Sequence, residues 1–364
     1  MIVDRYYYHQ LNKQEQAIYK AFYNGAMAHQ EIIPIPVRGE FSQESFERIF
    51  MAMTRDNPLI YFLNQSACST ASDVFGHIAI CPQYFFTKEK VKEYNRKIEK
   101  VVNELAGQLH LLECNDYEKE LRVHDWICQN VDYDYEGTDR EKIFRVIASH
   151  NILGVFAYHK AQCEGIAKAV KVLLNAVDVK CIVVTGDSVK NGQSVPHAWN
   201  IVDIEGDPYQ LDVTWNIGAM EQNNRLVAYD YFNLTDELMR QDHKTDNSLP
   251  ECKSKKANYY VRRGYFLEGT WIDSSYWKNG PLRTDIRYET EKAFLFDIML
   301  KEMKMLYINE QIYEFRAEGR LNKTGIEKEV ADRIVQRLYE RGRSGVGIKT
   351  CSNSNLGIYR IEIS

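Results

Sequence analysis

The chain has 364 residues, of which 45% are hydrophobic and 27% are charged, and its formal net charge is −5. This length allows two or three domains with a well-buried core, and the composition is ordinary for a soluble globular protein. The weak negative charge makes nucleic acid a poor partner. The first residues lack the pattern of a signal peptide, and no uncharged apolar run approaches the about 18 residues of a membrane span. We therefore expect a cytoplasmic protein without a membrane span, whose oligomeric state the sequence leaves open.

Eight cysteines are scattered along the chain without a Cys-x-x-Cys pair. This spacing is typical neither of a zinc site nor of a dense disulfide framework. We expect reduced thiols, with a disulfide between Cys68 and Cys81 as an open alternative, and neither a metal nor a cofactor.

Residues 1–89 are predicted to form an N-terminal segment of helices and extended strands. Asn12 and Glu15 have the spacing of a capping box, so a helix should run from there toward Ala28. The prolines within residues 32–37 exclude a helix there. A second helix should begin after Ser42, followed by strands at residues 59–64 and 74–81.

Residues 90–285 are predicted to form the central domain. Helices are expected at residues 88–109, after a cap at Thr87, and after a second cap at Asn115. A loop at 151–159 then leads into an amphipathic helix that begins near Cys163. Strands are expected at 180–185, 198–204 and 209–215. Helices followed by antiparallel strands are typical of an α+β fold.

Residues 286–364 are predicted to form a small α/β appendage. A helix at 294–305 and a strand at 311–317 are expected first. A second helix carries apolar residues at four-residue spacing from Ile326, and a strand at 356–363 closes the chain.

Cys163 stands at the predicted start of its helix. A thiol there is close to the positive end of the helix dipole and to unsatisfied backbone N–H groups, which favour the thiolate and could stabilise an oxyanion. The alternative is an ordinary buried cysteine. Gly165, two residues later, permits close approach of another backbone segment or of a substrate acyl group.

A hairpin supports the catalytic interpretation. Glu205-Gly206 suits a two-residue turn, which would pair His197 with Thr214. Asp212 would then be a diagonal neighbour of His197 on the same face, roughly 7–8 Å away at Cα. Without Asp212, a core histidine on a strand would be the better interpretation of His197.

Three motifs together resemble the core of bacterial transglutaminase-like proteins, relatives of the papain-type thiol enzymes. They are Cys163-Glu-Gly-Ile-Ala-Lys-Ala169, His197-Ala-Trp-Asn200 and Leu211-Asp-Val-Thr-Trp215. Residues 123–133, 229–237 and the pair Asp242-His243 also look like family segments, so the resemblance covers about residues 90–245. It departs from the family at Ile166, where tyrosine is common, and at Gln162, where valine is frequent.

The resemblance implies a papain/transglutaminase-like core, with a nucleophile helix packed on an antiparallel sheet. It also implies Cys163 as nucleophile, His197 as general base and acid, and Asp212 as the orienting carboxylate. The expected activity is thiol-dependent acyl transfer on protein or peptide amides, as a cysteine protease, amidase or transglutaminase-like enzyme. The alternative is a catalytically silent binding or scaffold protein.

Four further residues are candidates for substrate binding: Gln162, Gly165, Trp199 and Trp215. The two tryptophans could wall an acyl tunnel or be ordinary core aromatics. The pair His124-Asp125 invites comparison with metal-dependent hydrolases, but a structural ion pair or helix cap explains it more simply. His243 is expected to be exposed in an acidic surface loop.

Overall fold

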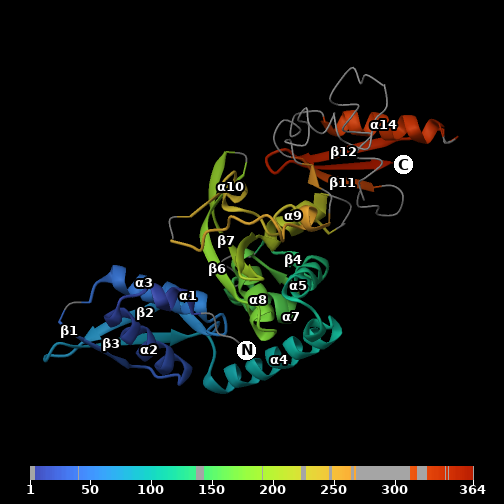
Figure 1. Cartoon of the computed structure of the whole chain (residues 1–364). Coiled ribbons are helices and arrows are strands. Elements are labelled where there is room, and N and C mark those ends of the chain that lie inside the picture. Colours follow the sequence, from blue (N-terminus) through green and yellow to red (C-terminus); the bar gives the residue numbers. More distant parts are fainter. Residues whose placement is uncertain are drawn as a thin grey trace. The chain divides into compact units, whose positions relative to one another are not determined.

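The computed structural model describes residues 5–39, 41–136, 143–190, 192–222, 227–245, 248–263, 266–267, 312–317, 326–340, 342 and 344–363. The chain forms two compact units (Figure 1). The first contains residues 1–227 and 242–253, and the second contains residues 228–241 and 254–364. The predicted domain boundaries at 89/90 and 285/286 stay predictions, and the second lies outside the described residues.

The first unit begins with a small α+β segment. Its elements are α1 (Tyr6–Gln10), α2 (Lys13–Met27), β1 (Ile33–Arg38), α3 (Gln43–Asp56), β2 (Leu63–Ser72) and β3 (His77–Tyr84). The strands form an antiparallel sheet in the order β1-β3-β2. Because β1 is an edge strand, it tolerates Pro34 and Pro36, which are exposed while the alternating residues Ile33, Ile35 and Val37 are buried.

Local capping explains where these helices begin. The side chains of Asn12 and Glu15 form the predicted capping box of α2, and Ser42 caps α3. The strands β2 and β3 lie further along the chain than predicted. The carboxylate of Asp73 accepts bonds from the N–H groups of Phe75 and His77, which fixes the hairpin turn at residues that we had assigned to a strand.

Helices dominate the next part of the first unit. They are α4 (Lys88–Gln108), η1 (Leu111–Glu113), α5 (Asp116–Asn130), α6 (Ile143–Ser149), α7 (Ile152–Tyr158) and α8 (Cys163–Ala176). Two short strands, β4 (Asp132–Tyr133) and β5 (Lys160–Ala161), pair in parallel just before α8. The predicted caps Thr87 and Asn115 begin α4 and α5. The loop predicted at 151–159 is wrong, because α7 occupies it.

A four-stranded antiparallel sheet completes the first unit. Its strands are β6 (Cys181–Lys190), β7 (Gln193–Ile204), β8 (Asp207–Leu211) and β9 (His243–Lys244), in the order β8-β7-β6-β9. Helix α8 packs on β6 and β7, and α5 and α7 pack against α8 (Figure 1). The predicted nucleophile helix on an antiparallel sheet is therefore confirmed.

The hairpin register is as predicted, but its second strand is shorter. Ile204 pairs with Asp207 and Asn200 with Leu211. The chain then turns into α9 (Val213–Gln222), so Thr214 does not pair with His197 as predicted. The β-branched and aromatic residues after Leu211 favoured a strand, but the side chain of Asp212 accepts a hydrogen bond from the N–H of Trp215 and starts the helix instead.

The second unit contains α10 (Asp236–Met239), α11 (Tyr259–Arg263), β10 (Phe266–Leu267), β11 (Ile312–Ala317), α14 (Ile326–Glu340), β12 (Ile348–Asn353) and β13 (Ile358–Ile363). The strands form a sheet in the order β10-β11-β13-β12. Buried Arg360 forms ion pairs with Asp230 and Glu314 across this unit. The predicted strand at 311–317, helix at 326 and closing strand are present, whereas the helix at 294–305 lies outside the described residues.

None of the helices in the described ranges combines the length and the apolar character that crossing a lipid bilayer requires.

Candidate active site

Cys163 is the first residue of α8. Its thiol is partly buried and packs against Ala167, Val183 and Ala198. The first N–H groups of a helix have no acceptor within the helix, and they form the positive end of its dipole. The thiol therefore lies where a negative charge on sulfur, or on an oxygen bonded next to it, is favoured.

The start of α8 is held in place by backbone contacts. The Gln162 N–H donates to the Ser149 carbonyl oxygen at 2.9 Å, and the Gln162 side-chain amide donates to the Asp134 carbonyl oxygen at 3.2 Å. A Cβ atom on Gly165 would lie only 2.5 Å from the Ser149 oxygen and 2.9 Å from that of Asn151. Gly165 thus allows close approach of another segment of this chain, which is one of the two predicted reasons for a glycine there. A direct role of Gln162 or Gly165 in substrate binding stays a prediction.

His197 lies on β7, opposite Gly186 of β6. Its Nε2 atom is 2.7 Å from Oδ2 of Asp212, and the thiol of Cys163 lies close enough to the imidazole to help raise its pKa. Because Nε2 is bound to Asp212, Nδ1 is the nitrogen available to the thiol. The structure thus brings together the three residues that the sequence predicted, in the order thiol, imidazole, carboxylate.

Asp212 lies between β8 and α9 and is completely buried. One carboxylate oxygen, Oδ1, accepts the N–H of Trp215 at 3.0 Å, and the other faces His197. The carboxylate therefore reaches His197 from a helix start, rather than from the diagonal position on a strand that we predicted. A helix N-terminus favours the negative charge of Asp212.

Charge pairing decides the protonation of His197 and Asp212. Burial disfavours the imidazolium, but the charge of Asp212 and hydrogen bonds to Asp212 and Cys163 outweigh it and raise the pKa of His197 to about 10. Burial likewise opposes the ionised form of Asp212, but His197 and His243 hold the pKa of that carboxyl well below its usual range. At neutral pH His197 is therefore an imidazolium and Asp212 a carboxylate.

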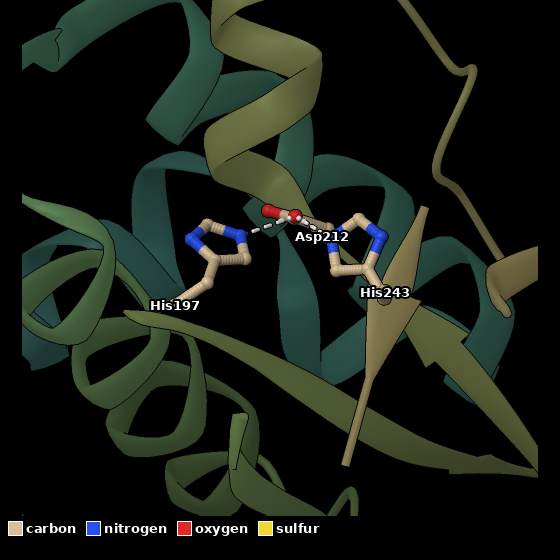
Figure 2. A group of neighbouring side chains, drawn as sticks. All are labelled: His197, Asp212 and His243. Carbon is tan, nitrogen blue, oxygen red and sulfur yellow. Dashed lines mark hydrogen bonds and ion pairs between the residues drawn. The ribbon is translucent and has the colours of Figure 1, made fainter. Parts of the chain in front are cut away.

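His243 is a fourth member of this group, and our expectation of an exposed loop was wrong. It is buried on β9, and its Nε2 atom lies 3.0 Å from Oδ2 of Asp212 (Figure 2). Its Nδ1 atom lies 2.6 Å from Oδ1 of Asp242. The polar composition of residues 242–247 suggested a surface loop, because Asp242, which pairs with the buried histidine, looks like a solvent-exposed charge in the sequence. The resemblance of Asp242-His243 to a family segment was the one signal that pointed to this residue.

The two tryptophans surround the imidazoles. Trp199 is buried, its ring is stacked 5.9 Å from that of His197, and its indole N–H donates to Gln210. Trp215 is partly exposed, and its ring lies 6.2 Å from that of His197. Trp199 therefore has the surroundings of a core aromatic, whereas a contact of Trp215 with substrate stays a prediction.

Tyr133 is a further residue beside the nucleophile that the sequence did not single out. It follows α5 and pairs with Ala161 in the parallel β4–β5 ladder, two residues before Cys163. Burial, followed by the negative charge on Cys163, raises the pKa of Tyr133 to about 12. The phenol of Tyr133 thus stays neutral at physiological pH and within electrostatic range of Cys163.

Within the described residues, the group that could hold a metal ion is His197, Asp212 and His243, whose ligand atoms lie within 4.8 Å of one another. Two N–O separations, 2.7 and 3.0 Å, are hydrogen-bond lengths. Zinc bonds of about 2.0 Å in a tetrahedral site would hold such ligand atoms about 3.3 Å apart. Hydrogen bonds therefore account for this group better than a shared ion.

His124 does not join that group. Its Nδ1 atom is 2.9 Å from Oδ1 of Asp125, and its Nε2 atom accepts a hydrogen bond from the Asn216 amide at 3.0 Å. These contacts join α5 to α9 behind Asp212. They agree with the structural interpretation of the His124-Asp125 pair.

Comparison with known proteins identifies relatives of this part of the chain. Residues 103–212 match the family model of the transglutaminase-like superfamily. Kyphoscoliosis peptidase of Mus musculus is 29% identical over 158 residues, and that of Homo sapiens is 27% identical over 162 residues. These matches cover 40% and 41% of this chain but 23% of each relative, so the chain spans less than a quarter of their length.

A solved structure described as a TGase covers 50% of this chain and 51% of its own. It shares 14% sequence identity and has a TM-score of 0.28, which is too low to support an argument.

Proposed function

Because residues 103–212 match the model of the transglutaminase-like superfamily, we propose that this protein catalyses thiol-dependent acyl transfer on protein or peptide amides. The observation that carries the proposal is the His197 imidazole, which is 2.7 Å from the Asp212 carboxylate and interacts electrostatically with the Cys163 thiol. A nucleophile, a base within hydrogen-bond reach and a group that orients the base are the parts that covalent catalysis needs.

In the proposed reaction, Cys163 attacks as a thiolate, paired with the His197 imidazolium. The sulfur bonds to the carbonyl carbon of an amide, and the carbonyl oxygen becomes an oxyanion near the Cys163 N–H. His197 gives the proton on Nδ1 to the leaving nitrogen, the C–N bond breaks, and a thioester remains on Cys163.

The thioester is then attacked by a second nucleophile. Water or an amine transfers a proton to His197 as it attacks, and the thiolate leaves. Water makes the protein a protease or amidase, whereas an amine makes it a transglutaminase-like enzyme. The two relatives named kyphoscoliosis peptidase favour hydrolysis.

The alternative is a silent domain that binds proteins without acyl transfer. Alkylation with iodoacetamide near pH 6 separates the two proposals. Five cysteines are partly exposed: Cys68, Cys81, Cys114, Cys163 and Cys351. If exposure alone controlled labelling, all five would react at similar rates.

Peptide mass spectrometry should show Cys163 labelled well ahead of the other four. The His197→Gln variant should lose this lead, because it lacks the imidazolium that would pair with the sulfur. A Cys163 that reacts no faster than its peers would favour the silent domain. The cytoplasmic location stays a prediction, to be checked by cell fractionation.

A further inference from the structure

His243 occupies the side of Asp212 that is opposite His197. Figure 2 shows the Asp212 carboxylate between the two imidazole rings, with one nitrogen of each ring directed at it and the other directed away. Both rings bind the same oxygen, Oδ2, at 2.7 Å from His197 and 3.0 Å from His243. The reaction proposed above assigns no task to this second imidazole.

Strand pairing fixes the backbone position of His243. His243 pairs with Ser188 of β6, and the Val189 N–H donates to the Asp242 carbonyl oxygen at 2.7 Å. A Cβ atom on Gly186 would overlap the carbonyl oxygen of Lys244, so β9 can pair here only beside a glycine. The side chain of His243 is 1% exposed.

Aromatic rings enclose the imidazole of His243. The ring centroid of Trp215 lies 4.7 Å away and that of Trp199 lies 5.1 Å away. Strand pairing and these rings leave the side chain little freedom to adopt another rotamer.

The two hydrogen bonds define the charge of His243. A neutral imidazole has one N–H, so one of its nitrogens would direct a lone pair at a carboxylate. Oxygens of Asp242 and Asp212 face the two nitrogens at 2.6 and 3.0 Å. Burial and the charge of His197 oppose protonation, but the two carboxylates outweigh them and raise the pKa of His243. His243 is therefore an imidazolium that donates to both carboxylates.

We propose that His243 is a positioning residue for the acyl-transfer site, and that Cys163, His197, Asp212, His243 and Asp242 act as one hydrogen-bonded chain. This inference rests on the function proposed above. His243 holds Oδ2 of Asp212 at the point from which it orients His197. The positive charge of His243 also offsets part of the negative charge of Asp212. His197 therefore holds its proton less tightly than it would if Asp212 bound no second imidazolium, and it donates that proton more readily to a leaving group.

Two variants separate positioning from charge. His243→Leu removes the hydrogen bond and the charge, whereas His243→Gln retains an N–H donor without the charge. The probe is p-nitrophenyl acetate, whose ester acylates a reactive cysteine and releases coloured nitrophenolate. The first-turnover rate is measured on the full-length protein as a function of pH, and peptide mapping locates the acyl group.

His243→Leu should slow acylation of Cys163 roughly 10- to 100-fold, by analogy with the loss seen when the hydrogen-bond partners that orient metal ligands are removed. His243→Gln should recover most of the rate, but the upper pH limit of activity should move to higher pH. A merely structural role would lower the amplitude of the reaction without moving that limit. His150→Gln is the matched control, because His150 pairs with Glu164 beside the nucleophile but not with Asp212.

The outcomes distinguish the two proposals. If the wild-type protein does not acylate at Cys163, the proposed function fails, and this inference fails with it. If the wild type acylates and both His243 variants match its rate and pH profile, only this inference is overturned. Zinc present at one equivalent in the purified protein, and lost in the His243→Leu variant, would also overturn it, because a metal would then join these residues.

Discussion

At the scale of single residues, the Asp212 carboxylate connects three parts of the fold. Its Oδ1 atom accepts the N–H of Trp215 at the start of α9, while Oδ2 receives His197 from β7 and His243 from β9. A buried carboxylate that lacked these donors would be costly, so each contact also stabilises the charge that the chemistry requires. The geometry of the site and the stability of the fold therefore depend on the same atoms.

Substitution of Asp212 tests this dependence. Asp212→Asn retains the size of the side chain but not its charge, so His197 should lose both its orientation and its stabilised imidazolium. We expect acylation of Cys163 to fall by about 10⁴-fold, the loss known for this change in a triad, measured as the first turnover of p-nitrophenyl acetate.

Asp203→Asn on β7 serves as the control, because its side chain accepts the N–H of Gly206 in the hairpin turn and pairs with Lys180 at 3.9 Å. It should acylate at the wild-type rate. An Asp212→Asn variant that is folded by circular dichroism and equally fast would show that Asp212 does not orient His197.

The triad could be predicted from the sequence because each of its residues lies in a motif with a local meaning. Cys163 stands at a helix start, and a hairpin turn sets the register of His197. His243 could not be predicted in this way. It reaches Asp212 through the pairing of a two-residue strand 31 positions further along the chain, and no local periodicity marks so short a strand.

At the scale of elements, the first turn of α8 fixes the position of Cys163. The close approach of the Ser149 and Asn151 carbonyl oxygens to Gly165 leaves no space for a side chain. Rigid backbone atoms on both sides mean that the turn could accept a larger residue only by moving Cys163.

Gly165→Ala should therefore destabilise the protein by about 1–3 kcal/mol, the usual cost of overpacking. Gly218→Ala is the matched control, because a Cβ atom there meets no other atom within 4 Å and α9 would gain roughly 0.5–1 kcal/mol from the better helix former. Urea unfolding should show opposite signs for the two variants. Equal shifts would mean that the contacts around Gly165 do not constrain α8.

Elements with local signals were predicted well, and elements that depend on tertiary contacts were not. The starts of α2 and α5 were predicted correctly from the capping boxes at Asn12 and Asn115. Helix α7 was missed because most of its seven residues are buried, so the sequence shows no polar face and no helical period. Gly186 lies within β6 because a side chain there would overlap β9, which pairs with β6 at this point. The sequence alone does not reveal this pairing.

At the scale of the whole molecule, the pairing of His197 makes stability depend on pH. The pKa of His197 is raised from 6.5 to about 10 in the folded protein. A group whose pKa is raised on folding stabilises the fold fully at pH values below its pKa in the unfolded protein. This contribution is lost as the pH rises through its pKa in the folded protein. Asp212, with its lowered pKa, has the opposite dependence, and its contribution is lost as pH falls below its unfolded value of 3.8.

The difference in unfolding free energy between wild type and His197→Gln should thus be largest near pH 5–6. It should be on the order of a few kcal/mol and should shrink between about pH 6.5 and 10. Urea unfolding at pH 6, 8 and 10 measures it. A difference that stays constant over this range would contradict the imidazolium assigned to His197.

The division of the chain could be predicted only in outline. The α+β class followed from helical and strand periodicity, and the helix of Cys163 on an antiparallel sheet followed from the resemblance to transglutaminase-like proteins. The unit boundaries did not, because residues 228–241 group with the later part of the chain while residues 242–253 return to the first unit. Such an exchange of segments depends on packing, which a linear pattern of apolar residues does not record.

The central claim is that Cys163 forms a thioester, and direct observation of that thioester tests it best. The full-length protein is treated with excess p-nitrophenyl acetate, quenched in acid and mapped by mass spectrometry. We predict one acetyl group on the Cys163 peptide, released by hydroxylamine, absent in Cys163→Ala and slow to form in His197→Gln. Acetylation that is unchanged in Cys163→Ala, or that is spread equally over the partly exposed cysteines, would contradict the account.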